Sequence, residues 1–320
     1  MRYKNFQFVL LFLFSAVLSA QKIDNTASFR DIKSERYFRI HYDNDYFSAT
    51  DKNYTQGYSL EFLAPGLIKN PVNHLFLRSE NRVTRYGIAL EHIGFTPKNI
   101  KSPEIQVGDR PFAAAIMLKS FMISTNSEEK YRITNSLSLG IIGPGAFGKE
   151  MQVGIHKATG NVIPEGWKNQ IKNDIVLNYE VGFEKQLFSY RDLFSLQSNS
   201  TLRLGTLFTN ASVGFNSIAG LLNSSFSSEE KHGKFQLYLY TQPLVNVIAY
   251  DATLQGGLFQ TSSPYTISSE EIERVTGQFN YGITLKTRSL YFEYFRSMIT
   301  REFESGSSAK WGGIRIGFTF

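Results

Sequence analysis

The side chains that could do chemistry fall in three segments of the chain, and the last of these carries His156. His156 lies in residues 143–160, a run that can form a short helix after its first turn, with Gly160 ending it. Lys149, Gln152 and His156 would then share one helix face, because residues three, four and seven positions apart are neighbours. A neutral histidine in such a place can serve as a general base. A solvent-exposed histidine is the alternative.

The other two segments are rich in oxygen donors or carry a fixed cation. Residues 43–57 contain Asn44-Asp45 and many more oxygen-bearing side chains, which hard cations such as calcium prefer. The spacing is not that of an EF-hand, so the segment is a candidate metal loop of no known type. Arg110 precedes Pro111 and could hold a phosphate or an oxyanion. A loop salt bridge is the default interpretation of Arg110.

Several familiar sites are excluded. The chain has no cysteine, which rules out a thiol nucleophile, disulfide bonds and a lipoprotein anchor. The motifs G-x-S-x-G, H-E-x-x-H, the P-loop and the dinucleotide fingerprint are absent. His41 and His92 lie inside strand patterns, whereas His74 and His232 fall in polar connections. We expect these four histidines to be structural or surface residues.

Strands must position these residues, because the dominant pattern after residue 36 is alternation with a period of two. In residues 175–184 and 278–286 apolar side chains occupy every second position. Glu61, Glu180, Glu184, Glu293 and Arg315 lie on the polar faces, as they would in the wet lumen of a barrel. The expected early strands are Phe38–Asp43, Gly57–Ala64, Tyr86–Gly94, Ala113–Ser124, Tyr131–Ile142 and Asp174–Lys185.

The ends of the chain favour a membrane barrel over a soluble β-sandwich, which would show the same alternation. The last strand ends on Phe320, as in the signal by which outer-membrane barrels are recognised for assembly. Residues 1–20 read as a secretory signal peptide cleaved after Ala20; a membrane anchor is the alternative. Residues 21–320 are then one domain, an all-β transmembrane antiparallel β-barrel of about 12 strands, located in the cell outer membrane.

Strand parity gathers the chemical segments at one end of this barrel. If the mature chain starts in the periplasm, residues 44–56, 95–112 and 143–173 all form extracellular connections. The formal charge of +6 is mild. It suits a partner coated in phosphate better than nucleic acid, for which no basic run is present.

The order of these motifs resembles that of the outer-membrane lipid A 3-O-deacylase family (LpxR-type). The resemblance runs from about Asp43 to Tyr179. Its motifs, in order, are Asn44-Asp45, Thr50-Asp51, Tyr54-Thr55-x-Gly57, Asp109-Arg110-Pro111-Phe112-Ala113, Gly143-Pro144, Gln152, His156, Gly160 and Gly166-Trp167-x-Asn169-Gln170. This chain departs from the family by having Phe112 and Ala114 where Tyr and Gly are frequent, and Asn161 and Val162 where a carboxylate follows the histidine.

The resemblance implies a calcium-dependent hydrolase that removes the 3′-linked acyloxyacyl chain from lipid A in lipopolysaccharide. His156 would be the base, with Arg110, Thr55 and Gln152 as further catalytic residues. Asn44 and Asp45 would hold Ca²⁺. Two other classes stay open: a phospholipase A-like lipid hydrolase with a serine nucleophile, and a non-enzymatic barrel such as a porin or adhesin.

Overall fold

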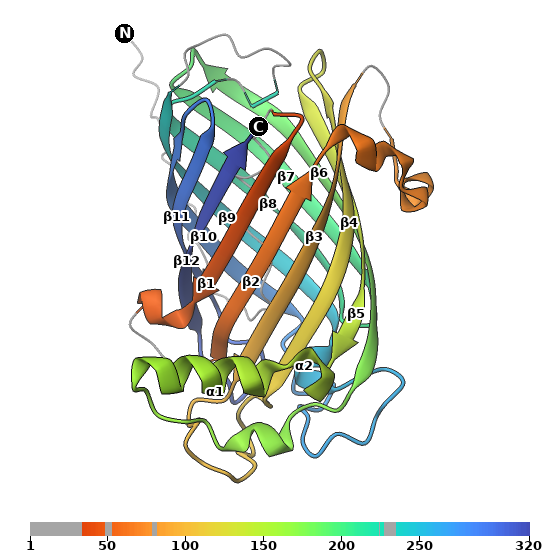
Figure 1. The fold of residues 1–320 in the computed structure, drawn as a ribbon, viewed down its shortest axis with the longest axis vertical. Coiled ribbons are helices and arrows are strands. Elements are labelled where there is room, and N and C mark those ends of the chain that lie inside the picture. Colours follow the sequence, from red (N-terminus) through yellow and green to blue (C-terminus); the bar gives the residue numbers. More distant parts are fainter. Residues whose placement is uncertain (1–33, 49–52, 79–81, 224, 227–234) are drawn as a thin grey trace, which may run out of the picture.

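The chain forms one closed barrel of antiparallel strands (Figure 1), in a computed structural model that describes residues 34–48, 53–78, 82–223, 225–226 and 235–320. Neighbours in sequence are neighbours in the barrel, and β1 pairs with β12 to close it. The strands are β1 (Tyr37–Asn44), β2 (Asn53–Leu63), β3 (Val83–Thr96), β4 (Ala113–Asn126), β5 (Tyr131–Ile142), β6 (Asp174–Tyr190), β7 (Phe194–Gly205), β8 (Phe208–Leu221), β9 (Gln236–Asp251), β10 (Val275–Lys286), β11 (Leu290–Ile299) and β12 (Ala309–Thr319).

Short helices occupy the connections. They are η2 (Asp45–Ser48), η3 (Pro65–Lys69), η4 (Pro71–Leu75), η5 (Pro144–Ala146), α1 (Gly148–Thr159), η6 (Gly166–Asn169) and α2 (Ala252–Gln255). No helix among the described residues is long and apolar enough to span a membrane. The predicted antiparallel barrel of about 12 strands, with a short helix in a long connection, is therefore confirmed, and each of the six early strands is found. The predicted signal peptide lies outside the described residues.

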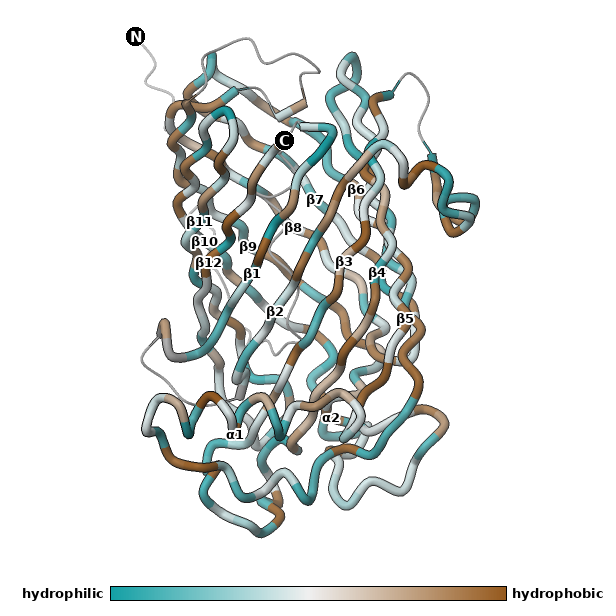
Figure 2. The backbone as a smooth tube through the Cα atoms, in the orientation of Figure 1, coloured by the Kyte–Doolittle hydropathy of each residue, from teal (hydrophilic) through white to brown (hydrophobic). Residues whose placement is uncertain are grey.

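Alternation along each strand separates an apolar outer wall from a polar interior, and Figure 2 shows teal and brown positions alternating along the strands. On β9 the outward side chains Leu239, Val245 and Val247 are exposed, whereas the inward Gln242 and Asn246 are fully buried. A closed sheet satisfies its backbone hydrogen bonds internally, so such a wall can face lipid along its whole height.

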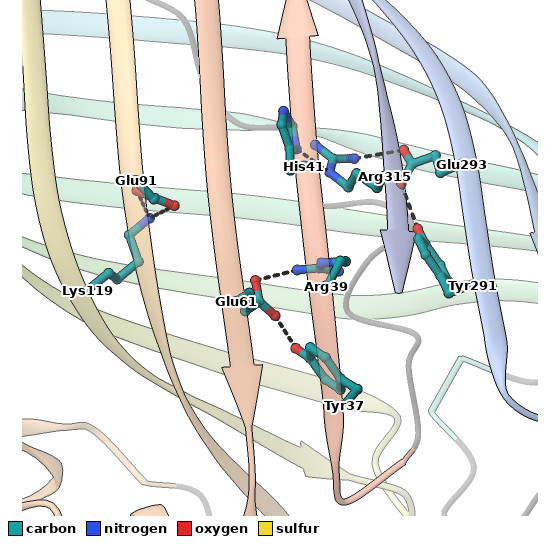
Figure 3. A network of polar contacts seen from close by, with 9 residues as sticks. All are labelled: Tyr37, Arg39, His41, Glu61, Glu91, Lys119, Tyr291, Glu293 and Arg315. Atoms are coloured by element: carbon teal, nitrogen blue, oxygen red, sulfur yellow. Dashed lines mark hydrogen bonds and ion pairs between the residues drawn. The ribbon is translucent and has the colours of Figure 1, made fainter. Parts of the chain in front are cut away.

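Ion pairs fill much of the interior. Arg315 donates to Glu293 at 2.8 Å, and Arg132 lies 3.0 Å from Glu184. Arg39 bonds Glu61 in the same way, and Lys119 bonds Glu91 (Figure 3). These charges face inward as the sequence predicted. The interior holds a cavity of about 120 Å³ lined by Arg39, Glu61 and Glu91, and another of about 50 Å³ lined by Glu91, Glu180 and Arg203.

The two ends of the barrel differ in their connections. At the loop end, residues 45–52, 97–112, 143–173, 252–274 and 300–308 connect the strands; at the turn end lie Tyr37, at the start of β1, and the C-terminus (Figure 1). The three chemical segments named from the sequence all lie at the loop end, as strand parity predicted. The first connection is shorter than the expected residues 44–56, because β1 runs to Asn44 and β2 already starts at Asn53.

The buried pair Arg132–Glu184 should matter to stability only when it is broken on one side. Glu184→Leu removes the carboxylate that pairs with the buried Arg132 guanidinium, which also bonds the Ser225 carbonyl and lies over the Phe226 ring. Because it leaves a buried charge without its counter-charge, this change should destabilise the barrel by about 3–5 kcal/mol. Arg132→Met/Glu184→Leu removes both charges and should recover most of that loss. The stability of both variants is measured by denaturant unfolding, with heat-modifiable gel mobility as the readout. Equal stability of the single and the double variant would contradict this role of the Arg132–Glu184 pair.

Candidate functional site

The loop helix α1 packs against the outside of the barrel, across the loop ends of the front strands (Figure 1). Its start is set by small residues: a Cβ on Gly148 would lie 2.4 Å from the Ala114 Cβ and 2.7 Å from the Trp167 ring. Ala114 faces outward on β4, since its neighbours Ala113 and Ala115 belong to inner contacts. Gly160 ends the helix at φ +70° and donates its N–H to the His156 carbonyl, as predicted.

Beneath this loop the outer wall carries polar rather than apolar side chains. Gln56 and His92 alternate with inward residues and so point outward, yet they are only 2% and 4% exposed. The loop covers His92, which contacts Ala146. The ring Nε2 of His92 donates to the Ala146 carbonyl at 2.9 Å. We call the outward residues Asn44, Thr55, Gln56, His92 and Thr96 the shelf.

The His156 ring is oriented by the backbone. Its Nδ1 hydrogen-bonds to the Val162 carbonyl just beyond the helix, and because a carbonyl can only accept, the ring must carry its proton on Nδ1. Nε2 then keeps its lone pair and is the atom that can accept a proton. No carboxylate contacts this ring among its described hydrogen bonds; the acceptor of the Nδ1–H is the Val162 backbone carbonyl.

Gln152 lies one helical turn before His156 on the same face of α1, and it is only 1% exposed. Its Oε1 accepts the indole N–H of Trp167 at 2.7 Å. This bond fixes the amide so that Nε2 is the free end, and Nε2 has no hydrogen-bond partner within the described residues. A buried donor without an acceptor is costly unless something occupies the space beside it.

The predicted metal residues lie at the end of β1. Asn44 faces outward opposite Gln56 in the β1–β2 register, and Asp45 begins η2 and is 2% exposed. Thr55 occupies the bulge of β2, where its hydroxyl bonds that of Thr96 at 2.5 Å. These three predicted residues are thus brought together at the loop end.

Inward side chains next to Asn44 hold the end of β1 through hydrogen bonds. The Asp43 carboxylate accepts from the Tyr54 hydroxyl at 2.7 Å and lies 3.0 Å from the His41 ring. His41 in turn accepts from Arg315 at 2.8 Å (Figure 3). Asp43 is completely buried and directly precedes Asn44, so this chain of bonds holds the end of β1 in place.

The donor atoms at this corner suit calcium in kind. The Asn44 amide, the Asp45 carboxylate and the Thr55 hydroxyl offer oxygen only, and calcium takes roughly six to eight oxygen ligands. Among the described residues no three His, Cys, Asp or Glu side chains come together. The described residues at this place thus offer no set of the nitrogen or thiolate ligands that a softer ion such as zinc prefers, and their oxygen donors are of the kind that calcium binds.

Arg110 lies apart from this group, inside the mouth of the barrel. Its guanidinium donates to Glu302 at 2.8 Å and to Thr253 at 3.1 Å, and it stacks over the Phe95 ring at 4.1 Å. None of its described contacts joins it to His156 or Gln152. The loop salt bridge, which was the default interpretation from the sequence, is the arrangement observed, with a partner 192 residues away.

Trp167 and His92 are the residues whose part the sequence did not reveal. Trp167 was only a member of a motif, and His92 was classed with strand histidines. A usable signal was present for His92, because it follows the outward Ile88 and Leu90 in the alternation and so places a polar ring on an otherwise apolar face.

Comparison with known proteins shows the family and the fold. The family model described as "Outer membrane protein LpxR" matches residues 6–320. Among solved structures, LpxR from Salmonella typhimurium matches with a TM-score of 0.72 and 18% identity, covering 89% of this chain and 100% of that one. The β domain of the Bordetella autotransporter BrkA matches at TM-score 0.45 and 6% identity, covering 89% and 98%. No curated protein sequence matches the chain.

The mouth of the barrel should respond to pH through Glu302. Burial raises the pKa of Glu302 to about 7 from the ordinary 4.5, although Arg110 opposes this. A raised folded-state pKa gives stability that is complete below the unfolded value and lost as pH rises through about 7. Wild type should therefore lose on the order of 3 kcal/mol relative to Glu302→Gln between about pH 5 and pH 8. Thermal unfolding in detergent tests this, and parallel profiles would contradict it.

Proposed function

We propose that this chain, which belongs to the LpxR family of outer-membrane proteins, is a lipid A 3-O-deacylase. It would hydrolyse the ester that links the 3′ acyloxyacyl chain to lipid A in lipopolysaccharide. The observation that carries the proposal is the position of His156 and Gln152 on a helix that lies against the outer wall, with a base and a buried free amide on one face.

The side of the wall on which this helix lies selects the class of substrate. Outer-membrane barrels have short periplasmic turns and longer extracellular loops, so the loop end is extracellular. A site in the lumen would receive water-soluble molecules. A site between α1 and the outer wall instead meets lipids of the outer leaflet, whose acyl chains lie beside the barrel and whose esters lie at headgroup depth.

The reaction needs no covalent intermediate. His156 Nε2 takes a proton from a water molecule, whose oxygen attacks the ester carbonyl carbon. The bond between the carbonyl carbon and the sugar oxygen then breaks. His156 returns the proton to the leaving sugar alkoxide, so that a fatty acid and a free sugar hydroxyl result. The Val162 carbonyl stabilises the imidazolium formed in between, because it accepts the Nδ1–H.

Charge on the carbonyl oxygen is met by fixed donors. Trp167 fixes the Gln152 amide by donating to its Oε1, and Nε2 has no partner among the described residues, so Nε2 can donate to the developing oxyanion. Asn44 and Asp45 would hold calcium. When bound, the ion would add positive charge beside the same oxygen. Thr55 would orient this corner through its bond to Thr96.

For Arg110 the geometry supports a positioning role. Its bonds to Glu302 and Thr253 fasten residues 97–112 to two other loops of the mouth. The Ile171 N–H bonds the Phe112 carbonyl, so the same loop also borders the segment that carries α1. Arg110 would thus act on the site through the loops rather than by touching substrate.

A serine-dependent phospholipase receives no support from the contacts of His156. Within the described residues its ring hydrogen-bonds to the Val162 carbonyl and to no serine hydroxyl.

The role of His156 gives the sharpest prediction. His156→Ala should lower deacylation by roughly 10²- to 10⁴-fold, the usual contribution of a general base. His156→Gln keeps a polar side chain but cannot accept the proton, and should be as inactive. Mass spectrometry of lipid A incubated with purified protein measures both, with heat-modifiable mobility as the control for folding. Near wild-type activity of folded His156→Ala would refute this mechanism.

Gln152 and Trp167 should act as one unit. Gln152→Ala removes the donor and should cost roughly 10²- to 10³-fold in rate. Trp167→Phe keeps the ring against Phe112 but removes the indole N–H, so we expect a smaller loss. Added to Gln152→Ala, Trp167→Phe should cost nothing further, because its effect passes through the amide. Additive losses in the double variant would mean that Trp167 only packs.

Calcium dependence follows from the oxygen donors at the end of β1. Excess chelator should abolish deacylation, and calcium should restore it better than zinc. Asp45→Asn keeps the volume but removes a charge, so it should raise the calcium concentration needed for half activity while the barrel stays folded. Full activity of the wild type in excess chelator would remove Asn44 and Asp45 from this role.

A further inference from the structure

The connection between β2 and β3 lies against the outer wall at the turn end, opposite to the candidate site. We call residues 64–78 the foot; they contain η3 and η4 (Figure 1). Instead of extending away from the rim, the foot lies beside β4, β5 and β6, which are up to four strands away from β2 in the barrel.

Three outward polar side chains hold the foot in place. Asn70 donates to Ser120 at 3.0 Å, and the Tyr179 hydroxyl donates to the Leu75 carbonyl at 2.8 Å. Asn135 accepts from the Leu77 N–H at 3.0 Å and donates to its carbonyl at 2.9 Å. Polar groups on a lipid-facing wall are costly unless they are bonded. The foot satisfies all three, so its position is built into the wall.

The foot is also rigid within itself. Asn70 caps η4 by accepting the Val72 N–H at 3.1 Å, and Pro71 starts the turn. The buried Asn73 donates to the carbonyls of Leu67 and Ile68 at 2.9 and 3.1 Å and so ties the two short helices together.

The outer surface of the foot is apolar and basic. Ile68, Leu75 and Leu77 are 58%, 61% and 56% exposed. Lys69 and Arg78 are exposed beside them, and residues 64–78 contain no acidic side chain. Rigid exposed leucines next to cations are the pattern of segments that lie in a membrane interface, with the apolar groups among acyl chains and the cations at phosphates.

The strands to which the foot is bonded, β5 and β6, also carry an aromatic pair. Tyr131 and Phe183 pair at 5.7 Å between their ring centroids on the same strands, and Phe183 is exposed. Aromatic side chains at the strand ends mark the membrane interface of such barrels. The turn end is periplasmic, so the leaflet at this depth is the periplasmic one.

We propose that the foot is a phospholipid-binding element that lies in the headgroup region of the periplasmic leaflet. Ile68, Leu75 and Leu77 insert toward the acyl chains, and Lys69 contacts lipid phosphates. The foot thereby holds the barrel at a defined depth and rotation, with α1 facing the opposite leaflet. This proposal does not depend on the catalytic role of His156.

The absence of cysteine in the chain makes the test clean. Leu75→Cys, carrying a nitroxide spin label, is reconstituted in vesicles of phosphatidylethanolamine and phosphatidylglycerol. The pinning bonds use the backbone of Leu75, so they remain. The control is Glu128→Cys, an exposed position in the turn between β4 and β5 at the same end. Both leaflets of these vesicles are alike, so the orientation of insertion does not matter.

We expect the label at position 75 to collide more with oxygen, which concentrates in lipid, than with a water-soluble nickel chelate. The label at position 128 should show the reverse. Equal exposure of both labels to the chelate would overturn the proposal, since the foot would then lie in water. Protection of position 75 from both reagents would also overturn it, because a protein surface such as a second copy would be covering the foot.

The phosphate contact has its own test. Adding Lys69→Glu to the labelled protein should increase chelate access at position 75 in phosphatidylglycerol vesicles. The matched control, Arg288→Glu in the exposed turn between β10 and β11, should leave it unchanged. Equal chelate access with and without Lys69→Glu would overturn the contact between Lys69 and phosphate.

Discussion

Closure of the barrel by the pairing of β1 with β12 is the constraint on which the other features depend. The register runs from Tyr37 opposite Thr319 to Asn44 opposite Gly312, so the last paired residue of β1 is a candidate metal ligand. Glycines on β12 allow β1 and η2 to pack closely against it. A Cβ on Gly313 would lie 2.5 Å from the Tyr42 carbonyl, and one on Gly312 would lie 2.9 Å from the Cβ of Phe47 in η2. Strand pairing and site geometry are therefore set together.

The inner and outer surfaces of the barrel have different roles. Inside, buried ion pairs and the chain from Arg315 through His41 to Asp43 hold strands in register. A buried pair contributes little net stability, but breaking one side of it is costly, so the interior favours one arrangement. Outside, most of the wall is apolar and can face lipid. The outer wall carries polar side chains at the shelf and beneath the foot, and at both places a connection covers polar groups.

These two covered places lie at opposite ends and would meet opposite leaflets. The shelf and α1 lie at the loop end, where the proposed site is located. The foot is bonded to the wall at the turn end and has no catalytic group of its own. An enzyme that acts on a lipid must keep its site at the depth of the bond to be broken, and a second contact at the far interface restrains tilt about that depth.

The sequence by itself determined the inward set of charges, because a period of two states directly which side chains share a face. The last strand ending on Phe320, rather than the alternation, favoured a barrel of about 12 strands over a β-sandwich. It also determined that Asn44, Asp45, Thr55, Gln152 and His156 gather at one end, since strand parity depends only on counting. It could not show that Arg110 pairs with Glu302 rather than approaching His156, nor that Trp167 holds Gln152. It could not show that the Val162 carbonyl accepts the Nδ1–H of His156, or that residues 64–78 lie on β4 to β6. Those contacts join segments that no local pattern relates, and only the closed barrel with its packed loops brings their atoms within bonding distance.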